Sequence, residues 1–274
     1  MNTLLQPFTR EIFVIPLLVG TMAGLLCGVM GVYIITRRLS YIAHGLSHAI
    51  LGGAVLSYVL EINFYIGSGI WGFITALLIQ YLTGRKVYSD AAIGIVTTAS
   101  FALGVAIIST HRNFSRNFEA ALFGNVLGVS QSDLIVVAGV TITLLALVVI
   151  FYRPLLFWSF DRDVAKVHGV PVVAMDTLFA LMLATLLVST LNILGVTLII
   201  SAVVIPASIA RLLSDRFSHI MIISGITGMI ISFLGIYLSY YLDIASGASV
   251  VLLSTLVFAG ALIWTNLWHR RRLA

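Results

Sequence analysis

Two histidines, His44 and His48, stand four residues apart in a stretch that stays apolar up to Glu61. Because residues four positions apart share one face of a helix, both imidazoles are expected to point in the same direction. Ionisable side chains inside a membrane are costly and usually line a pathway or a binding site. Imidazole is also the side chain that most often binds metal ions. The spacing therefore suggests a membrane-embedded site for a transition metal ion.

A structural role for the pair is the alternative, in which the rings bond to backbone carbonyls or to Ser40 and Ser47. One pair supplies only two ligands, whereas a metal ion usually has four or more. The remaining ligands would come from elsewhere in the chain or from a second copy across a symmetry axis. The other histidines are expected at span ends or in a cytoplasmic loop: His111, His168, His219 and His269.

The composition places these histidines in a membrane protein. Hydrophobic residues make up 60% of the chain and charged residues 9%, whereas ordinary soluble domains have about 25% charged residues. Several apolar runs reach the roughly 20 residues that cross a bilayer. We predict an all-α, polytopic transmembrane helical bundle, a single transmembrane domain over residues 1–274, with about nine spans, eight to ten being compatible with the pattern. The predicted spans are 12–36, 41–60, 64–83, 90–110, 132–152, 172–191, 194–211, 219–241 and 248–267.

Positive charge lies mainly between the spans and predicts their orientation. The net charge of +5 is attributed to cytoplasmic loops and not to nucleic-acid binding. Arginine or lysine clusters follow the first, third, fifth, seventh and ninth spans, so the N-terminus is expected outside and the C-terminus in the cytoplasm. Segment 111–131 carries Arg112 and Arg116 on the outer side, and its part 118–127 is a candidate interfacial or re-entrant helix.

The sequence offers no energy source of its own. It contains no phosphate-binding loop, nucleophile elbow or His-Glu-x-x-His helix. The carboxylates all lie near span ends, whereas a proton-coupled pump normally needs them within the membrane. Energy for any transport is therefore expected to come from a partner protein.

The loop 157–171 is the candidate contact for that partner. Ser159 or Asp161 could cap a short helix, and Gly169 followed by Pro171 would end it. A short helix lying on the cytoplasmic face can dock into a groove of another protein. The alternative is an ordinary interfacial linker helix.

Beyond these separate features, the chain resembles the permease subunits of the metal-ion ABC transporters for zinc, manganese and iron, nearly from end to end. The order and spacing of several short motifs carry the resemblance: Arg38–Tyr41 with Ser47–Ala49, Asp90–Gly94, Leu122–Leu127, Ser159–Asp161 through Ala165–Lys166 and Gly169–Pro171, Gly195–Leu198 through Ile205–Ala207, and Ser246–Ser249.

The resemblance implies a multi-pass transport subunit in the plasma or inner membrane of a bacterium, and not an enzyme. It implies no permanently bound cofactor, a transported divalent metal ion, and a dimer with a second copy of the chain within the membrane lipid. ATP would be bound by a separate cytoplasmic ATPase dimer, and an extracellular or periplasmic protein would deliver the metal. Segment 159–169 would be the coupling helix, with ATPase contacts at Ser159, Phe160, Asp161, Ala165, Lys166 and Gly169.

Gly195 and Pro206 are candidate gating positions, because proline removes a backbone hydrogen bond and lets a helix bend. A static kink is the alternative. The family's metal-passing histidine matches His48, but the family usually has aspartate where this chain has His44. Two copies would then present four imidazoles, which shifts the preference from manganese toward zinc or iron.

Two other functions stay open at the level of sequence. A permease for an organic metal chelate or a vitamin would have a similar helical build. A membrane metalloenzyme would need carboxylates or a nucleophile beside the histidines, and the sequence shows none there.

Overall fold

The computed structural model describes residues 11–83, 85, 87–110, 122, 124 and 128–273, and every regular element in this part of the chain is a helix. The predicted all-α fold is confirmed. The helices are α2 (Glu11–Thr36), α3 (Ser40–Val59), α4 (Phe64–Thr83), α5 (Ser89–Thr110), α7 (Gln131–Ile150), α8 (Tyr152–Phe160), α9 (Arg162–Val167), α10 (Val172–Leu194), α11 (Ile199–Leu213), α12 (Phe217–Leu242) and α13 (Ser246–Leu273).

Eight of these helices are long and apolar enough to cross a membrane: α2, α3, α4, α5, α7, α10, α12 and α13. The predicted span 194–211 corresponds to α11, which begins only at Ile199 and has 15 residues. A helix of that length rises about 22 Å, less than the roughly 30 Å of a bilayer core. The count is therefore eight full-length spans and one shorter apolar helix in the described residues.

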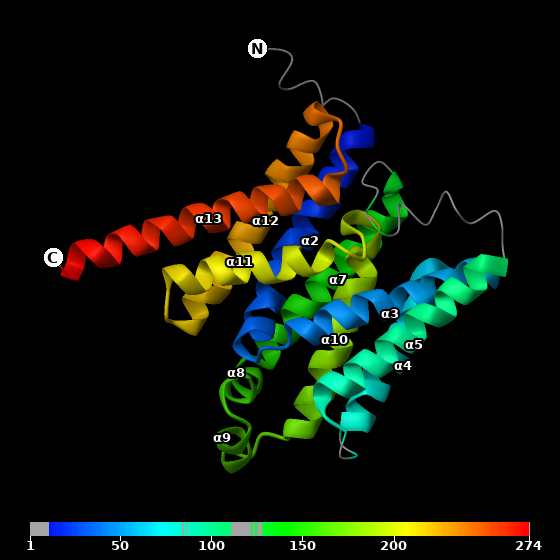
Figure 1. Ribbon diagram of the computed structural model, residues 1–274, viewed down its shortest axis with the longest axis horizontal. Helices are drawn as coiled ribbons and strands as arrows, with labels where there is room; N and C mark the ends of the chain where they lie inside the picture. The colour runs from blue at the N-terminus through cyan, green and yellow to red at the C-terminus, as the bar shows by residue number, and fades with distance from the viewer. Residues whose placement is uncertain are drawn as a thin grey trace.

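Helix α2 lies in the middle of the bundle and packs against α12, α11, α7 and α10 (Figure 1). Small residues bring α2 and α12 together. A Cβ added to Gly28 would lie 2.3 Å from the carbonyl oxygen of Ser224, and the Ser224 hydroxyl donates to the carbonyl of Gly28 at 2.6 Å. Glycine at this position permits the close approach that transmembrane helices use for packing.

Helices α3, α4 and α5 form a group beside this centre (Figure 1). A Cβ added to Gly52 of α3 would lie 2.5 Å from the carbonyl oxygen of Ser100 in α5. The Ser100 hydroxyl donates to the carbonyl of Ala49 at 2.9 Å and accepts a hydrogen bond from the indole of Trp71 in α4. The helix that carries both histidines is therefore held closely by its two neighbours.

The candidate interfacial helix at 118–127 lies outside the described residues, apart from Leu122 and Gly124. The carbonyl of Leu122 accepts hydrogen bonds from the backbone N–H and the hydroxyl of Thr197, at 3.2 and 2.7 Å. This contact joins the segment before α7 to the connection between α10 and α11.

Candidate functional site

The two histidines lie on one face of α3, as their spacing predicts. Their ring centroids are 4.7 Å apart, with the ring planes at 81°. The His48 ring also lies edge-on to Phe101 of α5, at 5.6 Å between centroids. His44 is exposed and His48 is half-buried. The pair therefore opens onto the outside of this single chain and not into its core.

Ser47, between the histidines on α3, uses its hydroxyl elsewhere. It donates to the carbonyl of His44 at 2.7 Å and to the carbonyl of Val196 at 3.2 Å. Neither imidazole is hydrogen-bonded to another described residue. The ring nitrogens of His44 and His48 are therefore available for a ligand.

A single chain brings too few ligands together for a complete metal site. The described residues contain no cluster of three or more histidine, cysteine, aspartate or glutamate side chains close enough to hold an ion. Cys27 is fully buried in α2. His44 and His48 thus stand as a two-ligand group on an exposed face.

The candidate gating residue Gly195 precedes Val196, whose carbonyl accepts the hydrogen bond from Ser47 of the histidine helix α3. Gly195 has φ +74° and ends α10, a backbone conformation that glycine adopts without strain. Its carbonyl accepts a hydrogen bond from the N–H of Ile199, where α11 begins. Pro206 is buried inside α11.

The loop predicted to bind a partner contains the six-residue helix α9. Asp161 is its N-cap: the carboxylate accepts hydrogen bonds from the backbone N–H groups of Asp163 and Val164, at 2.7 and 3.1 Å. These two N–H donors, Val164 first, lower the pKa of Asp161. Ser159, the other candidate cap, is a buried residue of α8 whose hydroxyl donates to Leu156. Gly169, at φ +74°, follows the end of α9.

Helix α9 lies outside the candidate spans, and exposed apolar side chains accompany its charged ones. Phe160, Val164 and Val167 are 60%, 45% and 85% exposed. Val164 and Val167, three residues apart, share one side of α9, whereas Phe160 is the last residue of α8. Ala165 is fully buried, and exposed Lys166 pairs with Asp163 at 3.0 Å. Sequence reasoning missed Val164 and Val167, although their spacing of three residues is a signal that it could have used.

Residues 9–265 match the sequence profile of the ABC 3 transport family. This chain belongs to that family. The expected resemblance to metal-ion ABC permeases is therefore confirmed, and the match covers every described helix except the end of α13.

Individual proteins agree with this assignment. The manganese transport system membrane protein MntC of Halalkalibacterium halodurans is 38% identical over 259 residues, covering 92% of this chain and 89% of that protein. A probable iron transport system membrane protein of Haemophilus influenzae is 32% identical over 266 residues, covering 97% and 94%. The structure of PsaBC from Streptococcus pneumoniae in complex with Fab matches with a TM-score of 0.85 and 32% identity, covering 94% of this chain and 92% of that one.

Proposed function

We propose that this chain is the permease subunit of an ATP-driven importer of a divalent transition metal ion, iron or manganese. The main support is the pair of imidazoles of His44 and His48 on the outer face of the long apolar helix α3, with ring centroids 4.7 Å apart. Membership of a transport family supports the permease role. Relatives named for manganese and for iron transport cover nearly the whole chain and support a metal ion as cargo.

The metal would pass between two copies of the chain. His44 and His48 supply two ligands from one chain, and a second copy related by a twofold axis would supply two more. Four imidazoles could hold an ion while one copy moves against the other in alternating access. The break at Gly195, which touches the histidine helix through Ser47 and Val196, is the proposed gate. Pro206 of α11 would let that short helix bend.

Ligand chemistry helps to rank the metals. Imidazole suits iron, zinc and copper, whereas carboxylate suits manganese. A histidine in place of the family's usual aspartate at position 44 therefore favours iron, and relatives of similar identity include one named for iron transport. Manganese follows, on the names of other relatives. Zinc also suits imidazole ligands, but the relatives cited here are named for manganese or iron transport.

Energy would enter from a separate ATPase that docks on α9. The exposed apolar side chains of Phe160, Val164 and Val167 would fit a groove of that protein. Asp161, Lys166 and Gly169 are exposed around them, while buried Ser159 and Ala165 would support the helix from below. The charge pattern favours a cytoplasmic position for α9, and an extracellular or periplasmic protein would deliver the metal on the other side.

The experiment is ATP-dependent uptake of metal by the chain reconstituted in lipid vesicles with its ATPase and its binding protein. Radioactive iron, manganese and zinc are offered separately and in competition. The proposal expects uptake of iron or manganese that requires ATP. Transport of an organic chelate or a vitamin without the free ions would support the alternative permease instead.

A further inference from the structure

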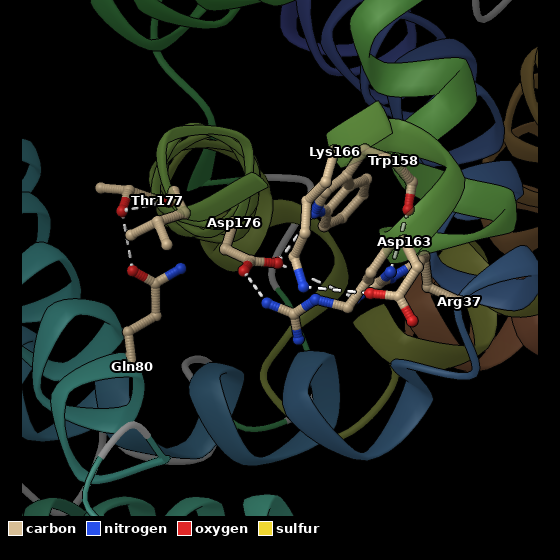
Figure 2. A network of polar contacts seen from close by, with 9 residues as sticks. Arg37, Gln80, Trp158, Asp163, Lys166, Asp176 and Thr177 are labelled. Carbon is tan, nitrogen blue, oxygen red and sulfur yellow. Dashed lines mark hydrogen bonds and ion pairs between the residues drawn. The ribbon is translucent and has the colours of Figure 1, made fainter. Parts of the chain in front are cut away.

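Asp176, in the second turn of α10, is the meeting point of side chains from three other parts of the chain (Figure 2). One carboxylate oxygen accepts a hydrogen bond from the indole Nε1 of Trp158 in α8, at 2.8 Å. The other is paired with the guanidinium of Arg162 in α9. Nη2 of Arg37, which follows α2, lies 3.8 Å from the first oxygen. A single carboxylate therefore connects four segments of the chain.

Arg37 also holds α8 directly. Its Nη1 donates to the carbonyl of Trp158 at 2.9 Å, and its guanidinium carbon lies 4.4 Å from the centroid of the indole ring. The side chain of Arg37 is only 15% exposed and Trp158 is 1% exposed. Burial lowers the pKa of Arg37, and the carboxylate of Asp176 opposes that shift. Shielding from solvent makes these contacts stronger than an exposed ion pair would be.

Arg37 begins the short turn that leads into the histidine helix. Arg38 has φ +58°, and the N–H of Leu39 bonds back to the carbonyl of Ile34 at 2.8 Å. This closure is the Schellman arrangement that ends α2. Helix α3 starts at Ser40, and His44 follows about 6 Å further along its axis. A shift of Arg37 therefore reaches the histidines through a turn with internal hydrogen bonds.

A cavity of about 360 Å³ separates the start of α3 from α10. Tyr41, Ile42 and Leu46 line it from α3, and Val173 and Ala180 line it from α10. Apolar contacts also join the two helices, since Leu46 of α3 and Leu183 of α10 line the cavity and belong to the same buried cluster. Arg37, Trp158 and Asp176 line the same cavity.

The opposite wall of the cavity is joined by a separate hydrogen bond. The hydroxyl of Thr177, next to Asp176, donates to Oε1 of Gln80 at 2.8 Å (Figure 2). Helices α4 and α10 are thereby connected at the same level.

We propose that Asp176, together with Arg37 and Trp158, transmits movement of α8 and α9 to α3 and so sets the position of His44 and His48 during transport. Asp176 is a positioning residue in this scheme and does not touch the metal. The inference rests on the proposed function and extends it, because it names the side chains that couple the ATPase contact to the metal site.

The test measures metal taken up per ATP hydrolysed, using the permease–ATPase complex in lipid vesicles. Asp176→Asn removes the charge but keeps the shape, and Trp158→Phe keeps the aromatic packing against Phe179 but removes the indole donor. Both should lower uptake per ATP by about tenfold, within the range of coupling between linked sites, while the ATPase still copurifies. Asp215→Asn is the matched control, because Asp215 is exposed in the loop between α11 and α12. Its ratio should equal that of the wild type.

A merely structural role would lower the yield of complex or scale both activities together, and would leave the ratio unchanged. An unchanged ratio in assembled Trp158→Phe or Asp176→Asn complexes overturns the inference. Absence of metal uptake by the wild-type complex would instead contradict the proposed function. The two failures are therefore distinguishable in one set of measurements.

Discussion

The imidazoles of His44 and His48 stand edge to face on α3, with ring centroids 4.7 Å apart and planes at 81°. His44 is exposed, whereas His48 is half-buried against Phe101. The two rings therefore share a face but not an environment. His48 is the more enclosed ligand candidate, and His44 is the more accessible one.

Removing either imidazole should impair transport to a different degree. We expect His48→Ala to abolish ATP-dependent metal uptake, and His44→Ala to lower it about tenfold or more. Uptake of radioactive iron and manganese by vesicles containing equal amounts of each variant measures the effect. His219→Ala is the matched control, because His219 is an exposed histidine at the start of α12. Wild-type uptake by the His48 variant would eliminate the proposed metal site.

Position 44 should control which metal is preferred. We expect His44→Asp to raise manganese uptake relative to iron and zinc, because a carboxylate oxygen is a better ligand for manganese than imidazole is. Competition uptake with paired ions gives the ratio directly. His44→Asn, which lacks the charge, should change it less. Identical ratios in all three proteins would show that residue 44 does not contact the ion.

The exposed apolar side of α9 should bind the ATPase. Val167 is 85% exposed, and burying a valine side chain contributes about 1.5 kcal/mol or more. Val167→Asp should therefore weaken ATPase binding by about tenfold. Val167→Leu keeps the apolar surface and should bind normally. Titration of detergent-solubilised permease with labelled ATPase measures both affinities, and equal values for the Asp and Leu variants would argue against this contact.

The Asp161 cap should act through its ionised form. Its lowered pKa means that stabilisation of α9 is complete above the ordinary aspartate pKa and disappears only as pH falls through the lowered value. Hydrogen exchange of residues 162–168 should thus be independent of Asp161 titration at neutral pH. Asp161→Ala should speed this exchange, and Asp161→Ser should largely restore protection. Unchanged exchange in the alanine variant would contradict the capping role.

Topology can be tested with single cysteines, since the native Cys27 is fully buried and should not react. Ile244 is 41% exposed beyond α12, and Tyr88 is 88% exposed before α5. A membrane-impermeant thiol reagent added to intact cells should label Ile244→Cys but not Tyr88→Cys. Permeabilised cells should allow labelling at both positions. The reverse pattern in intact cells would invert the orientation and place α9 outside.

Helix class, most span positions and the shared face of the histidines follow from the sequence alone. Long apolar runs have few alternatives to helices in a membrane, because backbone groups must be hydrogen-bonded internally. The i, i+4 relation of His44 and His48 is equally local. The sequence also predicted the short helix α9, because aspartate commonly precedes the start of a helix and glycine commonly follows its end.

Tertiary structure decided which of these residues face outward and which act together. No local pattern predicts that Arg37 and Asp176 meet Trp158, because they lie 121 and 18 residues from it in the sequence and in different parts of the fold. Ser159 and Ala165, two of the predicted ATPase contacts, are buried within the chain, which no local pattern predicts. Burial and long-range polar contacts depend on how helices pack, whereas helix formation and spacing depend on neighbours in the sequence. The histidine pair was therefore visible in the sequence, and its link to α9 only in the fold.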